Sequence, residues 1–259
     1  MIFYGKSDVG VVRTENQDSF GIFELLPGVT LAMVCDGMGG AAGGSVASSL
    51  AVETFADMMR EVLIPDSPED RAVLDDRTVK RALTLSAEAA NRAVWEKAHE
   101  KQDGRLDGMG TTLVGILTVG DERAWYINIG DSRLYFISNE GMWQLSHDHS
   151  YVQQMVDNGE MTAEEASASP MRNMITRAIG GDPTVEPDVR SVDFGFPEDG
   201  RRYLLLCSDG LYNGPGEQEI AGIIRGEDSI SVKTERLVKA ARNAGGQDNI
   251  TVILVEIDN

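Results

Sequence analysis

The 259-residue sequence is poor in cysteine, histidine, basic side chains and long apolar runs, and each shortage excludes a class of protein. Its two cysteines, Cys35 and Cys207, lie in apolar runs where cysteine packs as a small hydrophobic side chain, so no disulfide framework is indicated. No apolar segment approaches the roughly 18 residues that a membrane helix needs. Residues 1–10 lack a basic start and a long apolar run, so we expect no signal peptide and a cytoplasmic protein.

Acidic residues outnumber basic ones by 42 to 23, which gives a formal net charge of −19. Nucleic acid and anionic membranes are therefore not expected as main partners, because a phosphate backbone requires a basic protein face. Two interpretations of the excess charge remain open. The carboxylates form an ordinary solvated surface, or some of them neutralise bound cations.

Hydrophobic periodicity predicts two long helices, one from about Ser45 and one over about Thr78–Glu100, and a later helix over about Val232–Asn243. The prolines in segment 65–70 are expected to end the first helix. Strands are predicted at 2–8, 17–25, 29–36, 111–119, 123–130, 132–138, 141–146, 185–192, 203–208 and 249–257. Because the strands come in runs with short turns and the helices come in pairs, the pattern favours an α+β fold of antiparallel sheets flanked by helices.

Five aspartates flank predicted strands in turn-like sequence, most of them beside a glycine: Asp18, Asp36, Asp131, Asp209 and Asp248. One such aspartate is more often a turn residue than a ligand, but five together favour a common site. Two carboxylates about 4 Å apart repel by roughly 1 kcal/mol in water and about 4 kcal/mol at an effective dielectric near 20. Such a group needs protons or a counter-cation, and oxygen ligands without histidine or cysteine favour Mg²⁺ or Mn²⁺ over zinc.

Two divalent ions roughly 3.5–4 Å apart would share a water molecule, lower its pKa and direct it at a phosphorus atom. A basic residue should then hold the phosphate, and Arg13, five residues before Asp18, has a guanidinium fork that suits this task. A surface salt bridge is the alternative role for Arg13. The histidines, His99, His147 and His149, lack metalloprotease spacing and are expected to be surface or structural residues.

Two other functions fit parts of the sequence less well. Gly37, Gly39 and Ala42 match a weak dinucleotide fingerprint, with Asp57 as the acid about 20 residues on. That acid falls inside a predicted helix rather than at the end of a second strand, which argues against a dinucleotide fold. Cysteine-dependent phosphatase chemistry is excluded because the sixth positions after the two cysteines are Ala41 and Asn213 rather than arginine.

Eight motifs in chain order resemble the metal-dependent serine/threonine protein phosphatases of type 2C, in their compact bacterial form. They are RTENQDSF, VCDGMGG, GMGTTLVG, NIGDSRLYF, LSHDHSYV, ITRAIGGD, CSDGLYN and GGQDNITVILVEI, and they span nearly the whole chain. The resemblance implies a four-layer α-β-β-α sandwich, with two packed antiparallel sheets between helix pairs. It also implies one catalytic domain over residues 1–259, with a flap at about 147–180 beside the cleft.

The implied activity is hydrolysis of phosphoserine and phosphothreonine in proteins, in one step, by a water or hydroxide that bridges two Mn²⁺ or Mg²⁺ ions. By motif, Asp36 bridges both ions, the Gly37 carbonyl binds one, and Asp209 and Asp248 complete the direct ligands. Asp18 holds metal-bound waters, Asp131 and Asp209 correspond to a third ion site, and Arg13 corresponds to the phosphate-binding arginine. The implied partners are phosphoproteins and a counterpart Ser/Thr kinase, and a monomer is expected.

The sequence departs from the family pattern at positions around the cleft. Met38 stands where animal members carry a histidine thought to protonate the leaving oxygen, and Ala41, Ser45 and Ser169 also differ from frequent residues. These differences leave open a second hypothesis, a phosphoprotein-binding module whose centre is inactive. All predicted ligands are nevertheless present.

Overall fold

The runs of β-branched and aromatic residues form two antiparallel sheets in the computed structural model, which describes residues 1–63, 74–100, 106–121, 123–192 and 200–257. The first sheet has the order β1-β11-β10-β7-β8, made of β1 (Ile2–Asp8), β7 (Arg133–Ile137), β8 (Met142–Gln144), β10 (Arg202–Cys207) and β11 (Ile250–Ile257). The second has the order β2-β3-β5-β6-β9, made of β2 (Asp18–Leu26), β3 (Val29–Met38), β5 (Leu113–Val119), β6 (Arg123–Ile129) and β9 (Asp188–Val192). A short strand, β4 (Gly110–Thr111), pairs with the end of β3.

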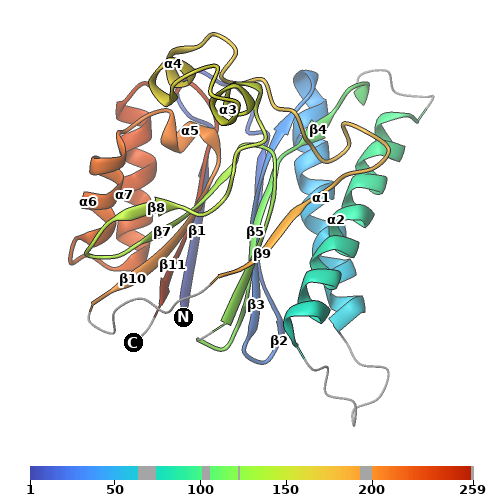
Figure 1. The fold of residues 1–259 in the computed structure, drawn as a ribbon, viewed down its shortest axis with the longest axis horizontal. Coiled ribbons are helices and arrows are strands. Elements are labelled where there is room, and N and C mark those ends of the chain that lie inside the picture. The colour runs from blue at the N-terminus through green and yellow to red at the C-terminus, as the bar shows by residue number, and fades with distance from the viewer. Residues whose placement is uncertain (64–73, 101–105, 122, 193–199, 258–259) are drawn as a thin grey trace.

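Helices cover the outer face of each sheet, so the predicted four-layer arrangement is confirmed (Figure 1). The helices α1 (Gly40–Leu63) and α2 (Asp76–Ala98) lie on the sheet that contains β2 and β3. The helices α6 (Glu217–Arg225) and α7 (Ile230–Asn243) lie on the other sheet. None of the described helices combines the length and the apolarity needed to cross a membrane.

Side-chain alternation along the strands creates three hydrophobic cores and also sets the direction of the polar residues at the strand ends. Along β3, Leu31, Met33 and Cys35 pack under α1 and α2, whereas Ala32 and Val34 pack between the two sheets. Asp36 continues the second series and so belongs to the space between the sheets. The same alternation in β10 assigns Leu204 and Leu206 to the inter-sheet core.

The segment predicted as a flap lies across one end of the two sheets (Figure 1). It contains two short helices, α3 (Tyr151–Asp157) and α4 (Ala163–Ala168), and stands near the short helix α5 (Asp209–Tyr212). Isolated β-bridges, Thr111–Ile179 and Ser150–Ile175, fix the end of the segment to β4 and to its own beginning. These bridges hold its last residues at the end of the sandwich where the aspartates gather.

Several predicted boundaries were wrong, each for a local reason. The first helix begins at Gly40 rather than near Ser45. Its opening residues are small and form no apolar stripe, so hydrophobic periodicity does not reveal them. The third strand continues past Asp36 to Met38, where it pairs with β4. The strand predicted at 185–192 begins only at Asp188, and α6 was not predicted. The helix-ending prolines of segment 65–70 lie outside the described residues.

Candidate metal and phosphate site

Strand register brings the first two predicted acids face to face. Asp18, the first residue of β2, is the direct cross-strand partner of Asp36 in β3. Directly opposed residues on antiparallel strands have Cβ atoms about 4.5–5.5 Å apart, so two like charges there destabilise the pair. Two aspartates on the two strands of one hairpin thus bring their carboxylates together at the end of the inter-sheet space.

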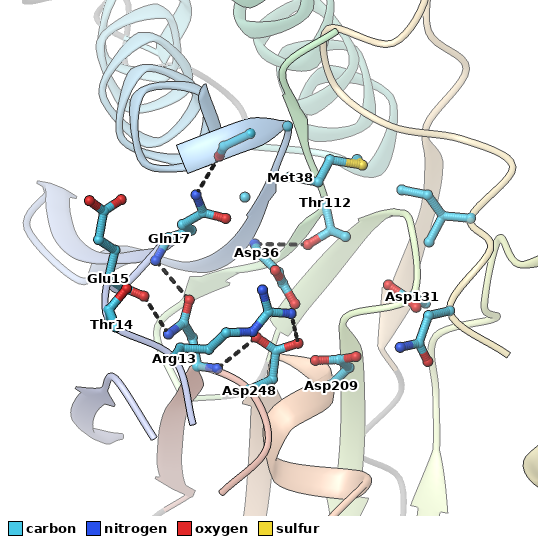
Figure 2. A pocket seen from close by; sticks show the side chains of 16 residues that line it. Arg13, Thr14, Glu15, Gln17, Asp36, Met38, Thr112, Asp131, Asp209 and Asp248 are labelled. Atoms are coloured by element: carbon cyan, nitrogen blue, oxygen red, sulfur yellow. Dashed lines mark hydrogen bonds and ion pairs between the residues drawn. The ribbon is translucent and has the colours of Figure 1, made fainter. Parts of the chain in front are cut away.

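The other predicted acids reach the same place from separate elements and line a pocket of about 510 Å³. Asp209 opens α5 two residues after the end of β10, Asp131 lies in the turn between β6 and β7, and Asp248 lies two residues before β11. Figure 2 shows Asp36, Asp209 and Asp248 facing one another, with Asp131 beside them. The walls also include Arg13, Gln17, Gly37, Met38, Thr112, Asn173, Ile175 and Asn249.

Four of these carboxyl groups titrate far above the usual range of aspartate, chiefly because burial disfavours the charged form. Burial and the Asp248 charge raise the pKa of Asp18 to about 6. Burial, followed by the charges of Asp131 and Asp248, raises the pKa of Asp209 to about 7. Burial and the Asp148 charge raise the pKa of Asp131 to about 6. Burial, with Asp18 as the strongest neighbouring charge, raises the pKa of Asp36 well above its ordinary value.

Two oxygens in this group have no hydrogen-bond partner among the described residues: Asp18 Oδ1 and Asp209 Oδ1. A buried carboxylate oxygen without a partner is costly, so these atoms favour a cation or a proton. No compact group of three His, Cys, Asp or Glu ligands occurs within the described parts of the chain. Mg²⁺ does not require one, since it keeps several waters and binds through one or two carboxylates. The all-oxygen donors therefore fit hard divalent cations.

Hydrogen bonds from the strands fix the backbone that carries Asp36. The Asp36 amide donates to Thr112 Oγ1 at 2.9 Å, and the Thr112 amide donates to the Asp36 carbonyl at 2.9 Å. Next to it, a Cβ on Gly37 would stand 2.1 Å from the Gly44 carbonyl oxygen, so only glycine fits there. The glycine after Asp36 serves close backbone packing against α1 rather than a sharp turn.

The buried Asp18 is held by hydroxyl groups of the opposite sheet. Ser208 Oγ donates to Asp18 Oδ2 at 2.7 Å and accepts from the Thr251 amide at 3.0 Å. Sequence reasoning missed Ser208, although it directly precedes Asp209 in one of the quoted motifs. Ser208 lies just past the end of β10 and continues the alternation of the inter-sheet residues Leu204 and Leu206, a signal that is visible only once the inner face of β10 is known.

Arg13 lies at the mouth of the pocket and is paired with a predicted ligand. Its Nη2 donates to Asp248 Oδ2 at 2.8 Å, and its side chain is 52% exposed (Figure 2). Asn249, which was also missed, holds the loop that carries Arg13. Its Oδ1 accepts from the Gln17 amide at 2.8 Å, and its Nδ2 donates to the Glu15 carbonyl at 2.9 Å. About half of the Arg13 side chain is thus exposed beside Asp248, in the lining of the pocket.

Two of the residues that depart from the family pattern, Met38 and Ser169, lie in the pocket wall and in the flap. Met38 lines the pocket wall (Figure 2). Ser169 is buried in the flap, where its hydroxyl accepts from the Met171 amide at 3.2 Å. The histidines have structural contacts: His99 caps α2, His147 pairs with Asp157, and His149 accepts from the Gly130 amide. The dinucleotide hypothesis was wrong, since the described strand pairs are antiparallel and Asp57 lies in α1, where it pairs with Arg60.

Comparison with known proteins places the chain in a family. The family model described as protein phosphatase 2C matches residues 11–253. Protein phosphatase PhpP of Streptococcus pneumoniae is 38% identical over 252 residues, which are 97% of this chain and 96% of that protein. The solved serine/threonine phosphatase of S. agalactiae is 32% identical, with a TM-score of 0.87 and 99% of each chain covered.

A further solved structure bears on the cations. The catalytic domain of the phosphatase PstP, in complex with two manganese ions, is 31% identical to this chain, with a TM-score of 0.79. The alignment covers 99% of this chain and 98% of that domain. With its fold, its acidic pocket and its near full-length match, the chain belongs to the protein phosphatase 2C family of metal-dependent serine/threonine phosphatases.

Proposed function

We propose that this protein hydrolyses phosphoserine and phosphothreonine in proteins, with divalent cations held by the acidic pocket. The observation that carries the proposal is a group of aspartates from four separate segments: Asp18, Asp131 and Asp209 are buried and Asp36 is half-buried. Two of their oxygens lack a partner among the described residues. Burying several carboxylates that repel one another is costly, and such groups are concentrated at functional sites. Mn²⁺ and Mg²⁺ are the cations that match its oxygen-only ligands.

The residues are assigned separate roles. Asp36, the Gly37 carbonyl, Asp209 and Asp248 would hold two ions directly. Asp18 would orient the water ligands of these ions from behind, and Asp131 with Asp209 would hold a third ion. When bound, the ions would supply positive charge that polarises the phosphate and lowers the pKa of the attacking water.

Arg13 would orient the phosphate. Its guanidinium stands beside Asp248 at the pocket mouth, so a phosphate on the ions would lie within reach of the same fork. The geometry also explains the pairing with Asp248, since the arginine neutralises part of the acidic pocket when no phosphate is present. No titratable side chain replaces histidine at Met38, so we assign the leaving-group proton to water rather than to a side chain.

We also propose that the chain is a single catalytic domain with a flap at about 147–180. Asn173 and Ile175 of this segment line the pocket, which supports a role in admitting the substrate. A counterpart Ser/Thr kinase and a monomeric state complete the proposal. Size-exclusion chromatography with light scattering tests the monomer.

The activity is tested by adding Mn²⁺ to chelator-treated protein with an aryl phosphate and a phosphothreonine peptide as substrates. We expect turnover of both substrates that depends on Mn²⁺ and disappears with excess chelator. Calorimetric binding of the phosphopeptide is measured alongside. Peptide binding without turnover at any Mn²⁺ concentration would instead support the inactive binding module.

A further inference from the structure

A tyrosine outside the predicted ligand set connects two of the acidic segments. Tyr212 ends the short helix α5, whose first residue is Asp209. Its hydroxyl donates to the Asp131 backbone carbonyl at 3.1 Å. One rigid helical turn therefore carries a carboxylate at its start and, at its end, a hydrogen bond to the residue that supplies the neighbouring carboxylate.

The Tyr212 ring is itself held in place. The guanidinium carbon of Arg133 lies 3.7 Å from the ring centroid, within the range of a strong cation–π contact. The guanidinium is fixed in turn by a fork on Asp148, with Nε and Nη2 at 3.0 and 2.7 Å from Oδ2. The hydroxyl of Tyr212 thus has little freedom to leave the Asp131 carbonyl.

The segment around Asp131 is fixed from the opposite side as well. Ser132 Oγ shares a hydrogen bond of 2.7 Å with Thr112 Oγ1, the same atom that accepts from the Asp36 amide. Gly130, on the other side, adopts a φ of +98°, a conformation suited to glycine, and its amide donates to His149. Within this frame, Tyr212 is the contact that joins the Asp131 segment to the helix of Asp209.

The Tyr212 hydrogen bond opposes the electrostatic repulsion between the carboxylates of Asp131 and Asp209. Asp131 is the strongest neighbouring charge acting on Asp209, and both side chains are buried. Without a fixed backbone, two such carboxylates would separate, and a cation between them would lose one ligand. Tyr212 prevents that separation from outside the ligand set.

We propose that Tyr212 is a positioning residue that sets the spacing between Asp131 and Asp209, and thereby the affinity of the third divalent cation. The inference rests on the proposed metal site. Tyr212 contacts the Asp131 backbone and is not among the residues that line the acidic pocket. Its effect should therefore appear in cation binding before it appears in chemistry.

The test compares wild type with Tyr212→Phe, which removes only the hydroxyl and keeps the ring on Arg133. Tyr126→Phe is the matched control, because the Tyr126 hydroxyl also donates to a backbone carbonyl, that of Leu145, at 2.8 Å. Chelator-treated protein is titrated with Mn²⁺ by calorimetry and by electron paramagnetic resonance of the free ion. The melting temperature is measured in chelator.

We expect Tyr212→Phe to weaken the lowest-affinity Mn²⁺ site about threefold to tenfold, the effect of one neutral hydrogen bond, and to leave the two tighter sites unchanged. Its melting temperature in chelator should match that of Tyr126→Phe. If Tyr212→Phe binds three Mn²⁺ ions with wild-type affinities, the role of Tyr212 is overturned while the proposed metal site stands. A melting temperature well below that of the control would also overturn it, by assigning Tyr212 a general structural role. Fewer than three sites in the wild type would reject the proposed third site itself.

Discussion

Two groups of largely buried charged side chains lie next to each other in this protein, and they differ in whether their charges have partners. In the first, Asp18, Asp36, Asp131 and Asp209 repel one another, and two of their oxygens lack partners among the described residues. In the second, the Arg133 guanidinium is fully used: it forks on Asp148, donates to the Tyr135 hydroxyl at 3.0 Å and stacks on Tyr212.

We infer from this difference that the first group binds a ligand and that the second group supports the structure. Gln144 also donates to Asp148, at 2.7 Å, so the second group has a partner for each charge and acts as a rigid brace. We infer that the first group keeps its charge uncompensated because a bound cation compensates it. The two meet at Asp131, whose carbonyl accepts from Tyr212 and whose carboxylate lines the pocket.

Removing one carboxylate from the uncompensated group should have the largest effect. The activity should fall, and the stability in chelator should rise. We expect Asp209→Asn to lose about 100-fold or more of the Mn²⁺-dependent turnover, at least as much as the loss of an outer-shell metal partner. In chelator, the same variant should be more stable by about 1–3 kcal/mol, because a buried repelling charge is gone. Turnover assays and urea unfolding measure both, and unchanged turnover would contradict the ligand assignment.

Removing one charge from the compensated group should only destabilise. Asp148→Asn leaves the partly buried Arg133 without its carboxylate, and we expect a loss of about 2–4 kcal/mol in the free energy of unfolding. Asp57→Asn, which breaks an exposed pair with Arg60, is the matched control and should cost less than about 0.5 kcal/mol. Equal effects of the two variants in urea unfolding would refute the distinction between brace and surface pair.

A change of pH should give the smallest effect and should sharpen the comparison. The folded protein raises the pKa of Asp18 and Asp131 to about 6 and that of Asp209 to about 7, above their unfolded values. The protonated folded form is therefore favoured at low pH, and its stabilising contribution is lost as the pH rises through 6 to 7.

The melting temperature in chelator should accordingly fall by a few degrees between pH 5.5 and pH 8. Saturating Mn²⁺ should remove this fall, because the cation takes the place of the protons. Asp209→Asn in chelator serves as the control and should show a shallower slope. A wild-type melting temperature in chelator that is independent of pH would count against an uncompensated acidic group.

Periodicity and local motifs determined most of the secondary structure, the antiparallel arrangement and the acids to inspect. Asp36 and Asp209 could be singled out because each follows a long apolar run. Ser208, Asn249 and Tyr212 could not be singled out with equal force, because serine, asparagine and tyrosine are common in turns and at strand ends. Their importance appears only in contacts with segments far along the chain, such as Asn249 with Glu15.

The sequence alone thus determined the element types and the excess of acid at the strand ends, since both depend on neighbours within one turn or one strand. Only the tertiary structure decided that Asp18 faces Asp36, that Arg13 pairs with Asp248 and that Tyr212 reaches Asp131. Register and sheet packing set these contacts, and both depend on the summed burial of three cores rather than on any local pattern.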